Sequence, residues 1–178
     1  MSSAAAQERR AGAHGRPAGV RLLVATWPEA LPLLGFSPLV TGVGRRSYDV
    51  GSCTAVLSAG FAGGCRPELC PGDVVLTGEA SPELRSRLAA VDGEVRTLER
   101  IATPADKAAL GREGAAAVDM ETKYLMQAAH EAGLPFLSLR LIIDRLDERA
   151  ISLATARHYP RACFALRKAV TVALQAWP

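Results

Sequence analysis

Three carboxylates stand where an α/β protein usually carries out its chemistry. Glu29 comes shortly after the apolar run 20–25. Glu121 lies in the first turn of an expected helix, and Asp144 ends the apolar run 136–143. Ligands of parallel sheets bind at the carboxyl ends of the strands. A carboxyl group that is partly withdrawn from water there has a raised pKa and can act as a general acid. These residues are therefore candidates for acid–base catalysis.

Two of the carboxylates also have simple structural explanations. Glu29 could stabilise the first turn of a short helix through the helix dipole. Asp144 could cap a turn against Arg145 or Arg149. The residues by themselves leave these explanations open beside the catalytic one.

The elements that must position the carboxylates centre on residues 118–148. Asp119 is a suitable N-cap for a helix over 120–132, which Gly133 and the following Leu-Pro end. The run 136–143 is almost wholly apolar, as expected of a strand covered on both faces. A helix followed directly by such a strand is half of a parallel α/β unit.

The rest of the chain alternates in the same way. We expect strands at 20–25, 36–41, 52–58, 73–77 and 94–102, and helices ending near 34 and covering 82–90, 104–111 and 161–177. Residues 1–19 are small, polar and rich in Gly and Pro, without the apolar core of a signal peptide, which predicts a disordered tail. The length then predicts a single domain over 20–178.

Composition excludes several classes of function. The net charge is +3 and the basic residues are scattered, so no basic stripe indicates nucleic acid binding. The four cysteines lack CxxC spacing and a companion histidine set, so we expect no metal site and reduced thiols in the cytoplasm. No run approaches the roughly 20 apolar residues of a membrane span.

Glycines follow two of the expected strands. The segment 42–44 is Gly-Val-Gly before Arg45 and Arg46, a weak signal for a phosphate site. The segment 60–64 is Gly-Phe-Ala-Gly-Gly, where a ligand could approach the backbone closely. A dinucleotide-binding fingerprint leads straight into a long helix, whereas here a Pro-Gly-Asp turn follows at 71–73, so a Rossmann cofactor site is disfavoured.

Together these stretches resemble the nucleoside phosphorylase and nucleosidase superfamily, which includes methylthioadenosine/S-adenosylhomocysteine nucleosidases, futalosine hydrolase and purine nucleoside phosphorylases. The resemblance is carried by 58–64 with 71–75, by Val-Asp-Met-Glu at 118–121, and by 140–144 with Asp147. The Gly-Phe-Ala-Gly-Gly form and the run 100–107 are most similar to the branch associated with hopanoid biosynthesis, thought to remove adenine from adenosylhopane. The resemblance implies a three-layer αβα fold with a mixed, largely parallel sheet.

The resemblance also implies roles for individual residues. Asp144 would donate a proton to N7 of a purine, and Glu29 would orient and deprotonate the attacking water. Glu121 would accept hydrogen bonds from the ribose hydroxyls. The remaining substrate-binding positions are Met120 under the sugar, Gly60, Phe61, Ala62 and Gly63 beside ribose and base, and Ile101 near the base. No metal or organic cofactor is required, and the partner is a small nucleoside.

The chain departs from the family pattern in three places. Ile143 replaces the Ser that commonly precedes the catalytic Asp. The segment 45–52 is too short for the helix usually found there, and 75–94 lacks pocket-closing strands and loops. We therefore expect a trimmed member of the superfamily, with homo-oligomeric contacts of a dimer or higher assembly that the trimming could alter.

The alternatives differ in the nucleophile and in activity. Phosphorylases hold phosphate with an Arg before the glycine-rich turn and a Ser within it, where this chain has Ser58 and Phe61. A carboxylate at Glu29 suits water and repels phosphate, which favours hydrolysis, although Arg45 or Arg46 leaves phosphorolysis open. A catalytically weak nucleoside-binding protein is the other alternative. The enzyme hypothesis requires the three carboxylates to converge on one cavity beside 60–64.

Overall fold

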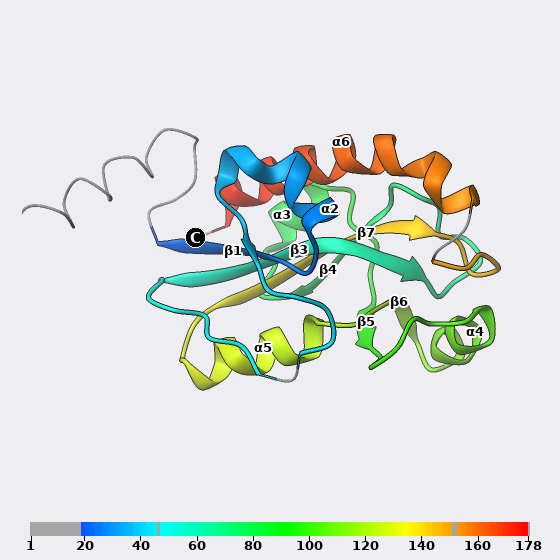
Figure 1. Cartoon of the computed structure of the whole chain (residues 1–178), viewed down its shortest axis with the longest axis horizontal. Helices are drawn as coiled ribbons and strands as arrows, with labels where there is room; N and C mark the ends of the chain where they lie inside the picture. Colours follow the sequence, from blue (N-terminus) through cyan, green and yellow to red (C-terminus); the bar gives the residue numbers. More distant parts are fainter. Residues whose placement is uncertain (1–18, 46, 151–152, 178) are drawn as a thin grey trace, which may run out of the picture.

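The computed structural model describes residues 19–45, 47–150 and 153–177. Within this part, helices cover both faces of one seven-stranded sheet (Figure 1). In chain order the elements are β1 (Val20–Val24), α2 (Trp27–Ala30), the 3₁₀ helix η2 (Leu31–Phe36), β2 (Leu39–Val40), β3 (Ala55–Gly64), β4 (Val74–Gly78), α3 (Pro82–Arg87), β5 (Glu94–Thr97), α4 (Pro104–Arg112), β6 (Ala115–Asp119), α5 (Thr122–Glu131), β7 (Phe136–Asp144) and α6 (Leu153–Ala176).

The sheet is mixed and largely parallel, as predicted from the resemblance. Strand β3 lies at its centre, parallel to β1 on one side and to β7 on the other. Strand β2 extends the parallel arrangement beyond β1, and β4 adds an antiparallel strand beside β7. The end of β3 also pairs antiparallel with β6, which is parallel to β5.

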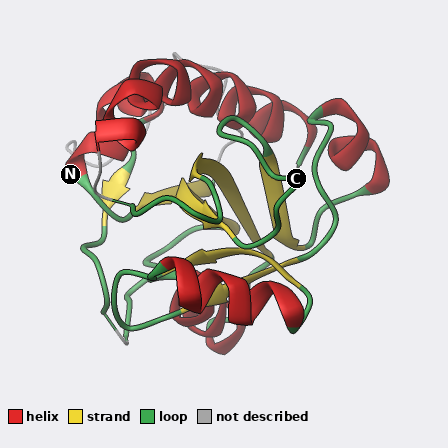
Figure 2. Ribbon diagram, turned by 90° about the vertical axis from the view of Figure 1, so that its right-hand side faces the viewer, coloured by secondary structure: helices red, strands yellow, loops and turns green. Residues whose placement is uncertain are grey.

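Each face of the sheet packs against its own helices, which confirms the three-layer fold (Figure 2). Leu22 and Val24 of β1 share a core with α6, whereas Leu23, between them, packs with Leu125 of α5. This alternation follows the two-residue period of a strand. Because both faces are covered, β3 and β7 are buried along nearly their whole length.

The glycine-rich segment 60–64 continues strand β3, whereas we predicted a strand ending at Ser58. The reason is its neighbour β7, which pairs with β3 as far as the Gly63–Asp144 register position. The glycines instead provide space for side chains. A Cβ atom at Gly60 would lie 2.4 Å from Oε1 of Glu29.

The predicted start of the helix over 120–132, with Asp119 as its N-cap, was also wrong. Ala115–Asp119 forms strand β6, and α5 begins at Thr122 with Glu121 as its N-cap residue. Glu121 is therefore not in the first helical turn, and Asp119 ends a strand instead of capping a helix. All five residues of β6 are buried in the sheet, which overrides the helix preference of alanine.

Other predicted boundaries shift without changing the architecture. The strand predicted at 36–41 is reduced to β2, the strand predicted at 94–102 ends at Thr97, and the last helix begins at Leu153 instead of Arg161. No helix or strand occurs between Thr41 and Thr54 in the described residues, which agrees with the predicted shortening. Residues 1–18 of the predicted tail 1–19, and Arg46, lie outside the described residues. Among those described, no helix is long and apolar enough to cross a membrane.

Candidate active site

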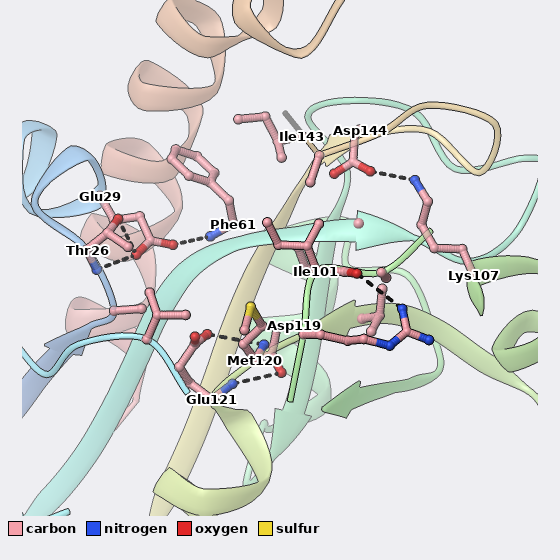
Figure 3. Close-up of a pocket in the computed structure, with 18 residues that line it drawn as sticks. Thr26, Glu29, Phe61, Ile101, Lys107, Asp119, Met120, Glu121, Ile143 and Asp144 are labelled. Atoms are coloured by element: carbon pink, nitrogen blue, oxygen red, sulfur yellow. Dashed lines mark hydrogen bonds and ion pairs between the residues drawn. The ribbon is translucent and has the colours of Figure 1, made fainter. Parts of the chain in front are cut away.

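The three carboxylates converge on one cavity of about 190 Å³ (Figure 3). Its lining comprises Ala25, Thr26, Glu29, Val43, Phe61, Ala62, Gly63, Arg100, Ile101, Ala102, Lys107, Val118, Asp119, Met120, Glu121, Ile143, Asp144 and Ala150. Every predicted site residue is in this set except Gly60, which lies directly behind the Glu29 carboxylate. Figure 3 shows Glu29 at one end of the cavity and Asp144 with Lys107 at the other.

Glu29 is buried and held by hydrogen bonds from two elements. Its Oε2 atom accepts from the backbone N–H of Thr26 at 2.9 Å and from the Thr26 hydroxyl at 3.0 Å. Its Oε1 atom accepts from the backbone N–H of Phe61 at 2.8 Å. Glu29 thus stabilises the first turn of α2, as in the simple structural explanation, and also reaches the cavity.

Glu121 occupies the turn between β6 and α5. Its side chain is only 6% exposed, and its Oε2 atom accepts a 3.3 Å hydrogen bond from the backbone N–H of Met120. Burial raises the pKa of Glu121 to about 7; Arg140 opposes this shift, while Asp119 and Glu29 add to it. The carboxyl group therefore titrates near neutral pH and is a strong acceptor once ionised.

A buried polar network lies beside Glu121. Nε of Arg140 donates to Oδ2 of Asp119 at 2.7 Å, and Nη2 of Arg140 donates to the Ser58 hydroxyl at 2.9 Å. Asp119 also accepts from the hydroxyl of Thr97 at 2.8 Å and from the backbone N–H of Glu121 at 3.3 Å. The network fixes the end of β6 and, with it, the turn that carries Glu121.

Asp144 meets a buried lysine. Nζ of Lys107 lies 2.5 Å from Oδ2 of Asp144, and the two side chains are 1% and 2% exposed. Oδ1 of Asp144 is buried and has no hydrogen-bond partner among the described residues. Burial raises the pKa of Asp144, while Lys107 opposes the shift. Asp144 consequently has one occupied oxygen and one that is available in the cavity.

Apolar side chains form most of the remaining wall. Phe61 packs edge-on against Tyr159 of α6, with ring centroids 5.8 Å apart. Ile101 is half-exposed and belongs to a turn that Arg100 fastens to Asp106 through two hydrogen bonds of 2.7 and 2.8 Å. The cavity thus combines apolar walls with a few directed polar groups, as ligand sites usually do.

The sequence did not identify every polar residue of the site. Lys107, Thr26 and the Arg140–Asp119 pair were not predicted to take part. The two predicted phosphate candidates gain no support, because Arg45 is exposed outside the cavity lining and Arg46 is not described.

The described residues contain no group of three or more His, Cys, Asp or Glu side chains arranged to hold a metal ion. The cations that line the cavity are Arg100 and Lys107, each already paired with a carboxylate.

Comparison with known protein families supports the resemblance found in the sequence. A sequence model of the phosphorylase superfamily matches residues 88–171. No curated protein matches the chain at the sequence level. The resemblance to the nucleoside phosphorylase and nucleosidase superfamily is thus confirmed by a match that includes β6, α5 and β7.

Solved structures extend this likeness to almost the whole fold. The 5′-methylthioadenosine/S-adenosylhomocysteine nucleosidase of Neisseria meningitidis has 17% identity and a TM-score of 0.70, with 88% of this chain and 98% of that chain covered. The S-adenosylhomocysteine nucleosidase of Streptococcus pyogenes has 17% identity and a TM-score of 0.70, with 94% of this chain and 100% of that chain covered. The futalosine hydrolase of Helicobacter pylori has 14% identity and a TM-score of 0.64, with 86% of this chain and 95% of that chain covered. The chain therefore has the fold of these nucleosidases.

Proposed function

We propose that this protein is a purine nucleoside N-glycosidase, which uses water to release adenine from an adenosine-type nucleoside. The observation that carries the proposal is the convergence of Glu29, Glu121 and Asp144 on one cavity with apolar walls. The likeness of the fold to methylthioadenosine/S-adenosylhomocysteine nucleosidases supports the same reaction class.

In this proposal Asp144 is the general acid. Its raised pKa favours the protonated form, and Oδ1 is free to donate that proton to N7 of the purine. The bond between C1′ and N9 then breaks, and its electron pair leaves with the purine. Protonation at N7 is needed because an anionic purine is a poor leaving group.

Glu121 and Met120 hold the sugar. An ionised Glu121 accepts hydrogen bonds from the ribose hydroxyls, and its negative charge stabilises the positive charge that develops on the ribose. Met120, which also lines the cavity, supplies an apolar surface under the ring. Phe61, Ala62 and Gly63 bound the ribose and base, and Ile101 contacts the base.

Glu29 is the proposed base. Its Oε2 atom is occupied by two hydrogen bonds and Oε1 by one, so Oε1 keeps an acceptor site for the attacking water. Glu29 takes a proton from this water as the water oxygen bonds to C1′. The products are adenine and the free sugar, and proton exchange with solvent then resets both carboxyl groups.

Water is favoured over phosphate by the charges around the cavity. Glu29 and, once ionised, Glu121 supply negative charge, whereas both lining cations are already paired with carboxylates. A phosphate anion would meet repulsion without an unpaired cation to bind it. Phosphorolysis is the alternative to be tested.

For the 5′ position we propose an apolar substituent, with adenosylhopane as the candidate. Val43 and Ile101 support this, because both line the cavity while remaining about half exposed, and so offer apolar surface to a group leaving it. The similarity of the 60–64 and 100–107 segments to the hopanoid-associated branch points the same way.

We also propose a cytoplasmic homo-oligomer. The four cysteines are free, which suits a reducing compartment. Trp27, Leu31 and Leu34 are 58–67% exposed on consecutive turns of α2 and η2, and such a patch is typical of an interaction surface.

The test is adenine release from methylthioadenosine, adenosine and an adenosine with a long apolar 5′ substituent, each with and without phosphate. Asp144→Asn should lower the rate of release by about 10²- to 10⁴-fold. Glu83→Gln, which changes an exposed acid of α3 outside the cavity lining, should leave the rate unchanged. Release that requires phosphate would replace hydrolysis with phosphorolysis. A folded protein that binds these nucleosides without releasing adenine would be a binding protein instead.

A further inference from the structure

We propose that Lys107 is a positioning residue for this reaction, which holds the Asp144 carboxyl group through Oδ2 so that Oδ1 faces the purine. The inference rests on the proposed function and adds to it a residue whose ammonium donors are all used within the protein. It is carried by the contacts of Lys107, by its burial and by the space that Gly63 leaves beside it.

Every proton of the Lys107 ammonium group has an acceptor. Nζ donates to Oδ2 of Asp144 at 2.5 Å, to the carbonyl of Glu148 at 2.7 Å and to the carbonyl of Arg145. An ammonium group has three donors, so none is left for a ligand. Lys107 is therefore fixed in place and acts on substrate only through Asp144.

Lys107 also holds backbone, because it donates to the carbonyl oxygens of Arg145 and Glu148. Arg145 and Glu148 belong to the turn that directly follows β7, and the backbone N–H of Arg145 donates to the Glu148 carboxylate at 2.9 Å. By holding both carbonyls, Lys107 ties this turn to α4. The position of Asp144 is thus fixed by strand β7 before it and by the turn held to Lys107 after it.

Local structure places Lys107 in the first turns of α4. Thr103 and Asp106 form a capping box around Pro104, and the backbone N–H of Lys107 donates to the carbonyl of Thr103 at 3.0 Å. Lysine is almost never fully buried unless it is paired, yet Lys107 is 0% exposed. Its burial is accounted for by Asp144 and the two carbonyls.

Gly63 of β3 makes room for the pair. A Cβ atom there would lie 3.1 Å from Cδ of Lys107 and 3.2 Å from Oδ2 of Asp144. Side chains from α4 and β7 therefore meet over a glycine of β3. Figure 3 shows the pair at the end of the cavity opposite Glu29. The proposed function assigns the base to this end.

The arrangement suits an acid that must give up its proton. When Oδ1 transfers its proton to N7, Asp144 becomes a carboxylate whose charge the neighbouring ammonium stabilises. The other groups facing Asp144 are Glu148, which raises its pKa, and the Cys65 thiol, whose own pKa is about 11 and which is therefore neutral at physiological pH. Lys107 is the cation that opposes the effect of burial on this acid.

The first experiment compares pH profiles of kcat for wild type, Lys107→Met, Lys107→Arg and Lys123→Met. Lys123 is an exposed lysine outside the cavity and serves as the matched control. Without the ammonium group the pKa of Asp144 rises, so the fall of kcat at alkaline pH should move upward by about one pH unit or more, and maximal kcat should fall about 10- to 100-fold. Lys107→Arg keeps the charge and should leave the alkaline limb near its wild-type position.

A merely structural role for Lys107 gives a different result. Loss of folded protein in Lys107→Met would scale the whole profile down without moving its alkaline limb, and this outcome would overturn the proposal. Lys123→Met should match wild type in both rate and profile.

The second experiment needs no substrate. The pKa of the Asp144 carboxyl group is measured by ¹³C NMR, with the resonance assigned through Asp144→Asn. The pKa should rise in Lys107→Met and stay close to wild type in Lys107→Arg and Lys123→Met; an unchanged value in Lys107→Met would overturn the proposal. A raised value in a protein that releases no adenine would support the Lys107–Asp144 coupling and refute the proposed function.

Discussion

The backbone N–H of Phe61 donates a 2.8 Å hydrogen bond to Oε1 of Glu29, which ties the short helix α2 to the central strand β3. The opposite oxygen of Glu29 is held by Thr26 at the start of the same helix. The carboxylate is therefore fixed relative to the cavity before any ligand enters. A fixed base avoids the cost of ordering a mobile side chain at the moment of reaction.

Gly60→Ala should impair catalysis through Glu29. The added Cβ would lie 2.4 Å from Oε1, so the carboxylate must move and lose its bond to Phe61. A neutral-donor hydrogen bond contributes about 1 kcal/mol or more, so kcat should fall about tenfold. Steady-state kinetics of adenine release would measure this. Gly35→Ala, whose Cβ would meet nothing closer than 3.5 Å, is the control; equal kcat values for both variants would contradict the prediction.

Glu121 should set the acidic limb of the pH profile. Its pKa is raised to about 7, chiefly by burial, and the ionised form is the stronger acceptor for the ribose hydroxyls and carries the charge that stabilises the sugar cation. The kcat/KM value should therefore rise as pH rises through about 7. In Glu121→Gln the acidic limb should disappear and kcat/KM should be low throughout. An unchanged acidic limb in this variant would assign it to another group.

The same raised pKa predicts a gain of stability in Glu121→Gln. Because the folded state binds the proton more tightly, wild-type stability should fall as pH rises from 4.5, the ordinary value, to about 7. The glutamine cannot ionise, so at pH 8 the variant should be more stable by up to about 3 kcal/mol, with little difference at pH 4. Urea denaturation at the two pH values measures this. A variant less stable than wild type at pH 8 would contradict the prediction.

Removing one partner of the buried Arg140–Asp119 pair should destabilise the fold more than removing both. Arg140→Met leaves the Asp119 carboxylate uncompensated, which typically costs about 3–5 kcal/mol. Adding Asp119→Asn should recover much of this loss. Arg96→Met, which breaks an exposed pair with Glu94, should cost less than about 1 kcal/mol. Similar losses for both single variants would show that the buried network is not important for stability.

The sequence predicted strand β7 and the carboxylate at its end well. The run 136–143 is long, apolar and bounded by Pro135 and Asp144, so its position in the sheet interior follows from hydrophobicity alone. The resemblance then supplied eight of the cavity-lining residues, because its motifs lie at strand ends that the fold brings together. Gly60 lies just behind that lining and acts by leaving space.

Features that depend on tertiary contact escaped prediction. The Ala-rich strand β6 has weak local strand preference and forms because β5 and the end of β3 pair with it. Lys107 looks like an ordinary surface residue of a helix, and only the approach of β7 to α4 makes it a partner of Asp144. Pairing of distant side chains leaves no periodic trace in a sequence.

The most direct test of the central claim is the rate of adenine release in phosphate-free buffer by wild type, Asp144→Asn and Glu29→Gln. Glu83→Gln is the matched control, since Glu83 is an exposed first-turn acid of α3 outside the cavity lining. We predict release by wild type and Glu83→Gln, and rates about 10²- to 10⁴-fold lower in the other two variants. No release by folded wild-type protein, or equal rates in all four proteins, would contradict the account.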